Sequence, residues 1–271
     1  MQSLRVVTYN VQRWACLERI VAALEGLRPE VLALNEVNGT AELEEVRTRL
    51  SMASCHFFGH ALGGNYGNAI LTRRASKEVA RLHLAGGSVV AGRDGRPHRI
   101  ARGAVAVSLA DEGVVVVATH FDHMAERERA AQAEDLLRSA ASRFGDRWLL
   151  CGDLNALVRS DYDAEAWAAL EAEHADRGWA GPSDSAAPGG AVAVLEAAGF
   201  GDLARGFGLL TSPAESPRRR IDHVFSSPGL RARAETAAVD PGALGSDHLP
   251  LVVDVAFPAA AAAAASGRQN S

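Results

Sequence analysis

Short apolar runs of strand length recur along the chain, and longer amphipathic stretches lie between them. Several of the short runs are almost continuously apolar, which is typical of strands that are buried on both faces of a sheet. The pattern predicts strands at residues 4–11, 30–37, 67–73, 103–110, 113–121, 147–154, 220–227 and 249–257.

Two longer stretches, at residues 15–27 and 124–144, have apolar residues at the three- to four-residue spacing of a helix. In the second stretch Ala133, Leu136 and Ala140 share one face, while charged residues lie elsewhere around the helix. A helix of this kind is suited to lying on a sheet.

Residues 159–201 are polar and contain Gly and Pro, and they interrupt the series of strands. Within them, residues 163–179 and 189–200 predict two further helices. We interpret the whole segment as an insertion between strands. The mixture of strands and helices then predicts a layered α/β fold, with two sheets packed face to face and helices outside.

The composition is that of a globular protein: of the 271 residues, 48% are hydrophobic and 23% are charged. We predict one domain over residues 1–258, followed by a disordered Ala-rich tail at 259–271. The three cysteines are widely spaced without a CxxC pair, so they suggest neither a disulfide framework nor a zinc site. The net charge of −5 argues against a general polyanion binder.

Four predicted strands end in acids, amides or imidazoles, and two later clusters have the same character. These polar sites are Asn10; Asn35 and Glu36; His120 with Asp122 and His123; Asp153 and Asn155; Asp222 and His223; and Asp247 and His248. Any one of them could simply cap a turn or a helix. Six such sites are hard to explain by capping, because a buried acid destabilises the fold unless it is paired or metal-bound.

These residue types point to metal-assisted chemistry on phosphate. Carboxylate oxygens without cysteine ligands suit a hard ion rather than zinc. We expect Mg²⁺, with Mn²⁺ as a substitute. Two separated histidines and several carboxylates offer acid–base groups for the attack of water on phosphorus. We interpret His123 and His223 as surface or supporting residues.

The order of the motifs is similar to that of the endonuclease/exonuclease/phosphatase superfamily, whose members include deoxyribonuclease I. The motifs are TYNV at 8–11, LxxxE ending at Glu36, GNAILTRR at 67–74, THFDH at 119–123, GDLNA at 152–156, RIDHVF at 220–225 and SDHLP at 246–250. GDLN or SDH alone is unspecific, whereas the ordered set is specific. The resemblance implies a four-layer α/β sandwich and Mg²⁺-dependent hydrolysis of phosphoesters.

The resemblance also assigns roles. Asn10, Glu36 and Asp247 would bind the metal, with Glu36 as the firmest direct ligand. His120 would contact the scissile phosphate, Asp153 would activate or orient water, and Asn155 would stabilise the pentacovalent phosphate. His248 would be a second catalytic imidazole, oriented by Asp222. Whether Asp153 or His248 removes the proton stays open.

The sequence departs from the family pattern at Asn35, where Gln is common, so the contact of that amide is expected to change. We predict substrate contacts for Asn68, Arg102 and Arg220. Arg102 closes a stretch that also holds Arg93, Arg96, Arg99 and His98. These arginines either bind phosphates or are solvated loop residues.

A phosphate ester of a small molecule or a lipid is the favoured substrate, since acidity disfavours tight duplex binding and aromatic residues make up only 6% of the chain. A nuclease of the same chemistry and a catalytically silent binding module are the alternatives. The chain has no predicted signal peptide or membrane anchor, so we expect a cytoplasmic protein, and a monomer.

Overall fold

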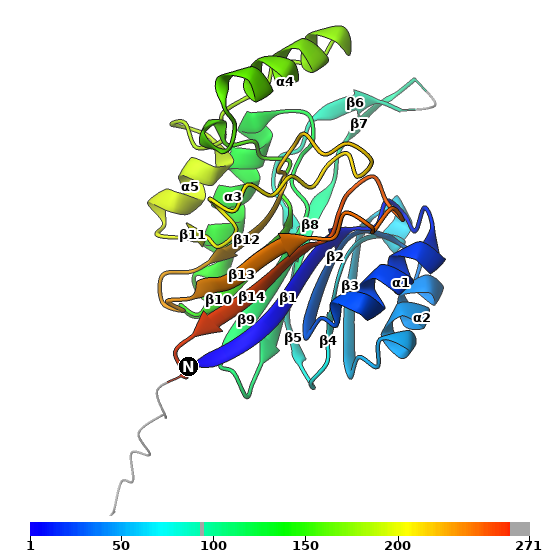
Figure 1. Ribbon diagram of the computed structural model, residues 1–271, viewed down its shortest axis with the longest axis vertical. Coiled ribbons are helices and arrows are strands. Elements are labelled where there is room, and N and C mark those ends of the chain that lie inside the picture. Colours follow the sequence, from blue (N-terminus) through cyan, green and yellow to red (C-terminus); the bar gives the residue numbers. More distant parts are fainter. Residues whose placement is uncertain (93–94, 261–271) are drawn as a thin grey trace, which may run out of the picture.

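The computed structural model describes residues 1–92 and 95–260. Two six-stranded sheets form its centre (Figure 1). The first sheet has the order β13-β14-β1-β2-β4-β3. Its strands are β1 (Gln2–Asn10), β2 (Val31–Asn38), β3 (Ser54–Ala61), β4 (Tyr66–Thr72), β13 (Arg233–Val239) and β14 (Leu251–Phe257).

The second sheet has the order β11-β12-β10-β9-β8-β5. Its strands are β5 (Lys77–Leu84), β8 (Arg102–Leu109), β9 (Val114–Thr119), β10 (Trp148–Asp153), β11 (Gly201–Asp202) and β12 (Asp222–Ser226). A separate hairpin joins β6 (Val89–Ala91) to β7 (Pro97–Arg99). Both large sheets are mixed, because β1 and β2 run parallel in one and β9 and β10 run parallel in the other.

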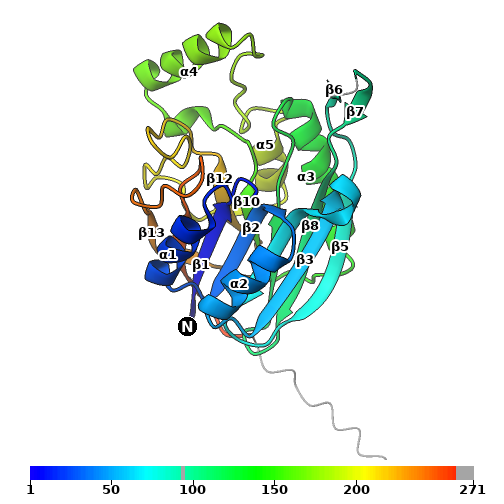
Figure 2. The same ribbon diagram turned by 90° about the vertical axis from the view of Figure 1, so that its right-hand side faces the viewer.

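Helices cover the outer face of each sheet (Figure 2). The first sheet carries α1 (Leu17–Leu27) and α2 (Ala41–Arg49), and the second carries α3 (Glu126–Ala140) and α5 (Ala191–Ala197). A further helix, α4 (Ala164–Asp176), lies apart from both sheets, and two short 3-10 turns span Leu62–Gly64 and Arg159–Asp161. The layers are therefore helix, sheet, sheet and helix, as the resemblance implied.

The apolar pattern explains these layers. Val6, Val116 and Val253 belong to the core between the two sheets, while their neighbours Val7, Val117 and Val252 face the helices. Central strands thus bury both faces, which is why their sequences are continuously apolar. The predicted face of α3 is confirmed, with Ala133 and Leu136 packed on the second sheet.

All the predicted strands and helices are present, but the sequence pattern missed others. The missed elements are α2, β3, β5, β6, β7, β11 and β13. Two of them, β5 and β13, form edges of the large sheets and expose alternate residues, so they lack the continuous apolar run that identified the central strands. The predicted tail lies, from residue 261 on, outside the described residues.

The carboxyl ends of β1, β2, β9 and β10 lie at the end of the molecule away from the N-terminus. Both views place α4 and the β6–β7 hairpin beyond this end, on opposite sides (Figures 1 and 2). None of the helices in residues 1–92 and 95–260 has the length and apolar character that a membrane span requires.

Candidate active site

Strand pairing gathers the predicted polar residues at one edge of the two sheets. In the first sheet Asn10 of β1 lies opposite Asn35 of β2. In the second sheet Asp153 of β10 lies opposite Asp222 of β12, and His120 directly follows β9, the parallel neighbour of β10. Residues from both sheets therefore meet around one site.

Gly152 and Asn35 fix the position of the Asp153 backbone. Gly152 has φ +146°, and a Cβ atom there would lie 1.8 Å from the carbonyl oxygen of Thr119, so only glycine fits. Asn35 Oδ1 accepts a hydrogen bond of 2.8 Å from the backbone N–H of Asp153, while Asn35 Nδ2 donates to Thr119 O and Asn68 Oδ1. The amide of Asn35, which stands where the family commonly has Gln, thus connects the first sheet to the second.

One oxygen of Asp153 is the centre of the site. Asn10 Nδ2 donates to Asp153 Oδ2 at 3.1 Å, and the Nε2 atoms of His120 and His248 lie 3.4 and 3.6 Å from the same oxygen. Asp153 Oδ1 accepts from the backbone N–H of Asn155 at 2.9 Å, and Asn155 has a left-handed φ of 50°. This turn places Asn155 Nδ2 within 3.0 Å of His120 Nε2.

His248 lies between two carboxylates. Its Nδ1 is 2.8 Å from Asp222 Oδ2, as the predicted orienting role of Asp222 requires, and its Nε2 faces Asp153. Burial opposes a charge on His248, but the two carboxylates outweigh it and raise its pKa above the ordinary value. Burial and the charge of Asp222 raise the pKa of Asp153, against the lowering effect of His248. This arrangement favours a protonated imidazole.

His120 has the opposite environment. Burial and then the positive charge of Arg102 hold its pKa well below the ordinary value. Arg102 Nη1 lies 3.4 Å from His120 Nδ1, and Asn155 Nδ2 lies 3.0 Å from His120 Nε2. Both neighbours are donors, so the acceptor nitrogen of a neutral His120 faces one of them, and the ring lies between Arg102 on one side and Asp153 and Asn155 on the other.

Glu36 and Asp247 flank this centre. Glu36 has φ 57° at the irregularity between Leu34 and Val37 in the pairing of β2 with β4. A bulge of this kind re-aims a side chain, and a strained non-glycine residue is a mark of function. Asp247 is exposed, and its charge contributes to the raised pKa of His248.

The donors of the site fit a hard divalent cation. Oxygens of Asp153 and Asp222 and a ring nitrogen of His248 lie within 4.8 Å of one another. Because His248 is protonated, the two carboxylates are the groups of this cluster that can bind a cation. Asp222 Oδ1 is buried without a partner among the described residues. Of the predicted metal group, Asn10 contacts Asp153 directly, whereas Glu36 and Asp247 are absent from the tight cluster.

Asn68, which the sequence predicts to contact substrate, lies in the frame behind the site. Its side chain is fully buried, its Oδ1 accepts from Asn35, and its Nδ2 donates to Gly103 O at 2.8 Å. Both polar atoms of the amide thus serve to join β4 to the neighbouring strands, because Gly103 lies in the second sheet.

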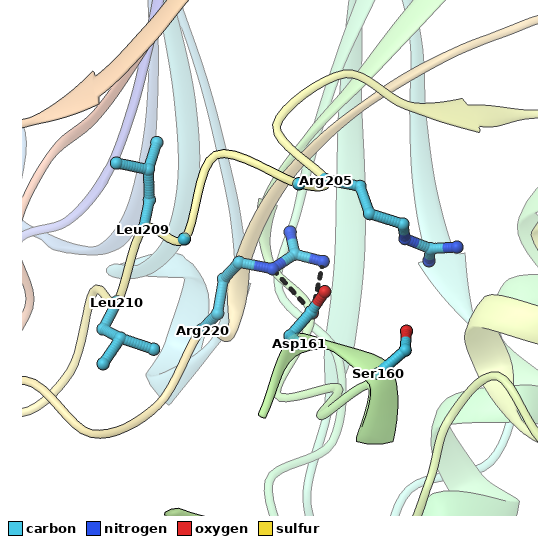
Figure 3. A pocket seen from close by; sticks show the side chains of 8 residues that line it. Ser160, Asp161, Arg205, Leu209, Leu210 and Arg220 are labelled. Carbon is cyan, nitrogen blue, oxygen red and sulfur yellow. Dashed lines mark hydrogen bonds and ion pairs between the residues drawn. The ribbon is translucent and has the colours of Figure 1, made fainter. Parts of the chain in front are cut away.

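Arg220, which the sequence predicts to bind substrate, is held by carboxylates of the fold itself. Arg220 is 2% exposed, and its guanidinium bonds Asp161 Oδ2 at 2.8 Å (Figure 3). It also bonds Asp202 Oδ2 at 2.8 Å and lies 3.1 Å from His223 Nδ1. It lines a cavity of about 250 Å³ on whose other side Arg205 lies. We call Asp161, Asp202, Arg220 and His223 the Arg220 network. Two carboxylates already neutralise this arginine, and His223 is buried rather than on the surface.

The arginine-rich stretch before β8 divides into different environments. Arg93 lies outside the described residues, while Arg96 and Arg99 are exposed on the hairpin side. Arg102 begins β8 and is 5% exposed, with Nη2 3.1 Å from His123 Nδ1. Of the arginines that the structure describes in this stretch, Arg102 alone therefore reaches the predicted catalytic residues.

Sequence reasoning missed His60 and undervalued His123. His60 stands near the end of β3, is 7% exposed, and lowers the pKa of His120 electrostatically. The same signal that identified His120, a histidine at the end of an apolar run, is present in FFGH at residues 57–60. It was overlooked because β3 itself was not predicted.

Comparison with known proteins agrees with this geometry. The sequence model of the Endonuclease/Exonuclease/phosphatase family matches residues 7–248. No curated protein sequence is significantly similar to that of this chain.

Three solved structures illustrate the similarity of fold. An endonuclease/exonuclease/phosphatase from Bacteroides vulgatus has a TM-score of 0.67 at 17% identity, over 95% of this chain and 100% of that one. The human Nocturnin catalytic domain with bound sulfate gives 0.62 at 18%, over 94% of each chain. A mannosyl-6-phosphatase from Bacteroides thetaiotaomicron gives 0.59 at 16%, over 94% and 100%.

Proposed function

Because the chain belongs to the endonuclease/exonuclease/phosphatase family, we propose that it is a metal-dependent phosphoesterase that uses Mg²⁺ or Mn²⁺. The observation that supports this most is the arrangement around Asp153 Oδ2, on which Asn10, His120 and His248 converge from three different strands or loops. This arrangement does not serve the stability of the fold, because it buries the Asp153 carboxylate without enough partners to offset the loss of its hydration.

The metal would be held by Glu36, Asn10 and Asp247 together with the carboxylates of the buried cluster. When bound, it supplies positive charge that stabilises the phosphate oxygens and the ionised acids. Carboxylate-rich sites without thiolates select Mg²⁺ or Mn²⁺ over zinc.

The protein residues then divide the work of hydrolysis. Water attacks phosphorus in line with the ester oxygen, so one P–O bond forms while the bond to the leaving oxygen breaks. His248 is held in its charged form by Asp222, which favours Asp153 as the acceptor of the water proton and His248 as a cation for the phosphate. The neutral His120 ring and the Asn155 amide would supply N–H groups for phosphate oxygens.

The favoured substrate is a phosphate ester of a small molecule or a lipid, because the chain carries a net charge of −5 and nonspecific duplex binding depends on neutralised phosphates. A nuclease is the second candidate. It is favoured by the exposed Arg96, His98 and Arg99 on the hairpin side of the site (Figure 2), which are positioned for a long anionic substrate.

The test is an assay of the purified protein on p-nitrophenyl phosphate, bis(p-nitrophenyl) phosphate and plasmid DNA, each with Mg²⁺ and with EDTA. Turnover that needs Mg²⁺ supports the proposal, and equal turnover in EDTA contradicts the metal mechanism. Cleavage of the diester and DNA with strong inhibition by salt favours the nuclease. If the purified protein turns over none of the three substrates in the presence of Mg²⁺, the result favours a catalytically silent binding module.

A further inference from the structure

A second polar cluster surrounds the guanidinium of Arg102, next to the catalytic centre. We call His60, Tyr66, Arg102 and His123 the Arg102 cluster. Arg102 Nη2 lies 3.1 Å from His123 Nδ1, and the Tyr66 ring packs against that of His60 with centroids 6.2 Å apart. Its members come from β3, β4, β8 and the loop after β9. The topology thus collects them from both sheets at the end where the active site lies.

The positive charge of Arg102 is not balanced by an ion pair. No carboxylate of the described residues lies within ion-pair distance of its guanidinium, although the side chain is only 5% exposed. The neighbouring imidazoles cannot balance the charge of Arg102 either, because a histidine side chain is either neutral or positively charged. Burial and then the charge of Arg102 lower the pKa of His60 to about 4 and also lower that of His123. The cluster therefore presents one buried cation among neutral donors.

Three buried polar atoms of the cluster have no partner among the described residues. They are Arg102 Nε and both ring nitrogens of His60. His60 is 7% exposed, so these atoms are largely shielded from bulk water. Unmatched polar groups at this depth destabilise the fold by more than an ordinary hydrogen bond stabilises it. An anion with several acceptor oxygens would accept from Arg102 Nε and from the one N–H group that a neutral His60 carries, and it would neutralise the guanidinium at the same time.

The His120 ring separates the Arg102 cluster from the reacting groups. Its Nδ1 faces Arg102 at 3.4 Å, while its Nε2 faces Asp153 Oδ2, also at 3.4 Å. An anion bound by Arg102 would therefore lie one imidazole ring away from the attacking water, too far to be the phosphate that is cleaved. Arg102 and Asp153 thus lie on opposite sides of the His120 ring.

We infer that the Arg102 cluster is a subsite for a second phosphate group, on the side of His120 away from Asp153. This inference rests on the proposed phosphoesterase function. The phosphate can be part of the substrate, which then carries two phosphates, or it can be free inorganic phosphate; a guanidinium and neutral imidazole donors recognise both. His60 and Arg102 supply the N–H groups that bind its oxygens.

A pair of matched substrates tests the inference. The first is propyl p-nitrophenyl phosphate, and the second is the same diester with a phosphorylated hydroxyl group at the far end of the propyl chain. Both release the same leaving group, so the ratio of their kcat/KM values reports recognition of the second phosphate. The wild type, Arg102→Gln, His60→Phe and the control Arg81→Gln are compared in Mg²⁺. Arg81 is exposed on β5 of the same sheet, where it pairs with Glu78.

We expect the wild type to prefer the doubly phosphorylated ester by about tenfold or more, since charge-assisted hydrogen bonds to phosphate are strong. Arg102→Gln should abolish this preference and His60→Phe should reduce it, while Arg81→Gln retains it. Calorimetric titration of inorganic phosphate in EDTA provides a readout without turnover. The wild type and Arg81→Gln should bind phosphate, and Arg102→Gln should bind it about tenfold more weakly.

The outcomes separate the two proposals. Phosphate binding that depends on Arg102, without a substrate preference, identifies free phosphate as the ligand. An unchanged substrate ratio and unchanged phosphate binding in both Arg102→Gln and His60→Phe overturn the subsite. If the wild type hydrolyses neither ester in Mg²⁺, the phosphoesterase proposal fails, and the titration alone then decides whether the cluster binds phosphate.

Discussion

Two groups of buried charges lie at the same end of the second sheet, but their charges are balanced very differently. In the Arg220 network one arginine is held by two carboxylates, and His223 completes its contacts. In the active site Arg102 has no carboxylate partner among the described residues, and Asp222 Oδ1 is an unpaired acceptor. Depth does not distinguish the groups, because Arg102 and Arg220 are 5% and 2% exposed.

The difference shows which buried charges are structural. A carboxylate and a guanidinium that satisfy each other hold loops in place, and removing either one leaves a buried charge unpaired. Charges that the fold leaves incompletely matched are instead available to a ligand. Balance, rather than burial or residue type, therefore separates the frame of this protein from its reactive site.

The largest expected effect is on turnover in the active site. Asp153→Asn should lower kcat by about 10²–10⁴-fold, because the proposed proton acceptor is lost. The melting temperature of the metal-free protein should hold or rise, since a buried and poorly compensated carboxylate is removed. Steady-state kinetics in Mg²⁺ and calorimetry in EDTA measure the two effects. The exposed Asp176→Asn on α4 is the control, and full activity of Asp153→Asn would refute the assignment.

A substitution in the Arg220 network should lower the stability of the fold and leave turnover largely unchanged. Asp202→Asn keeps the shape of the side chain but leaves Arg220 without one of its two carboxylates, so unfolding should become easier by roughly 3–5 kcal/mol. The folded fraction should keep most of its turnover. Urea denaturation and the phosphoesterase assay measure both. A loss of activity without a loss of stability would mean that this network belongs to the reactive site after all.

Acid should remove the contribution of Asp202. Burial opposes its ionisation, but the hydrogen bond and charge of His223 and the charge of Arg220 outweigh burial and hold its pKa well below the ordinary value. A depressed pKa stabilises the fold fully above the unfolded value of about 3.9 and progressively less below it. The difference in unfolding free energy between wild type and Asp202→Asn should thus stay constant from neutral pH down to about 5 and then shrink. A difference that grows in acid would contradict the pairing.

The residues of the active site follow from the sequence because one local rule locates them. Asn10, His120 and Asp153 each end an almost continuously apolar run, and parallel strands bring such ends to one edge. The central strands were recognisable for the same reason. Edge strands such as β3 were not, and with β3 the sequence pattern also missed His60.

The partners of the arginines could not be predicted from local sequence. From the sequence, Arg220 looks like an unpaired charge next to two further arginines at 218–219. In the structure it bonds Asp161 and Asp202, which are 59 and 18 residues away along the chain. From the sequence, Arg102 looks like one of several arginines in a loop. In the structure it is buried at the start of β8, whereas Arg96 and Arg99 are exposed. Charge balance depends on tertiary contacts, so the distinction between these two arginines required the structure.

The smallest expected effect concerns an ion pair at the surface, where balance should matter little. Arg5 Nε and Nη2 bond the two oxygens of Asp254 at 2.7 and 2.9 Å across β1 and β14, but the Arg5 side chain is 42% exposed. Water compensates either charge when the other is removed, so Arg5→Ala should make unfolding easier by only about 0.5–1 kcal/mol. Because salt screens exposed charges, this difference should shrink further at about 1 M salt, whereas that of Asp202→Asn should persist. Urea denaturation at low and high salt measures both variants. Equal losses in the two variants would show that burial adds nothing to the effect of an unpaired charge.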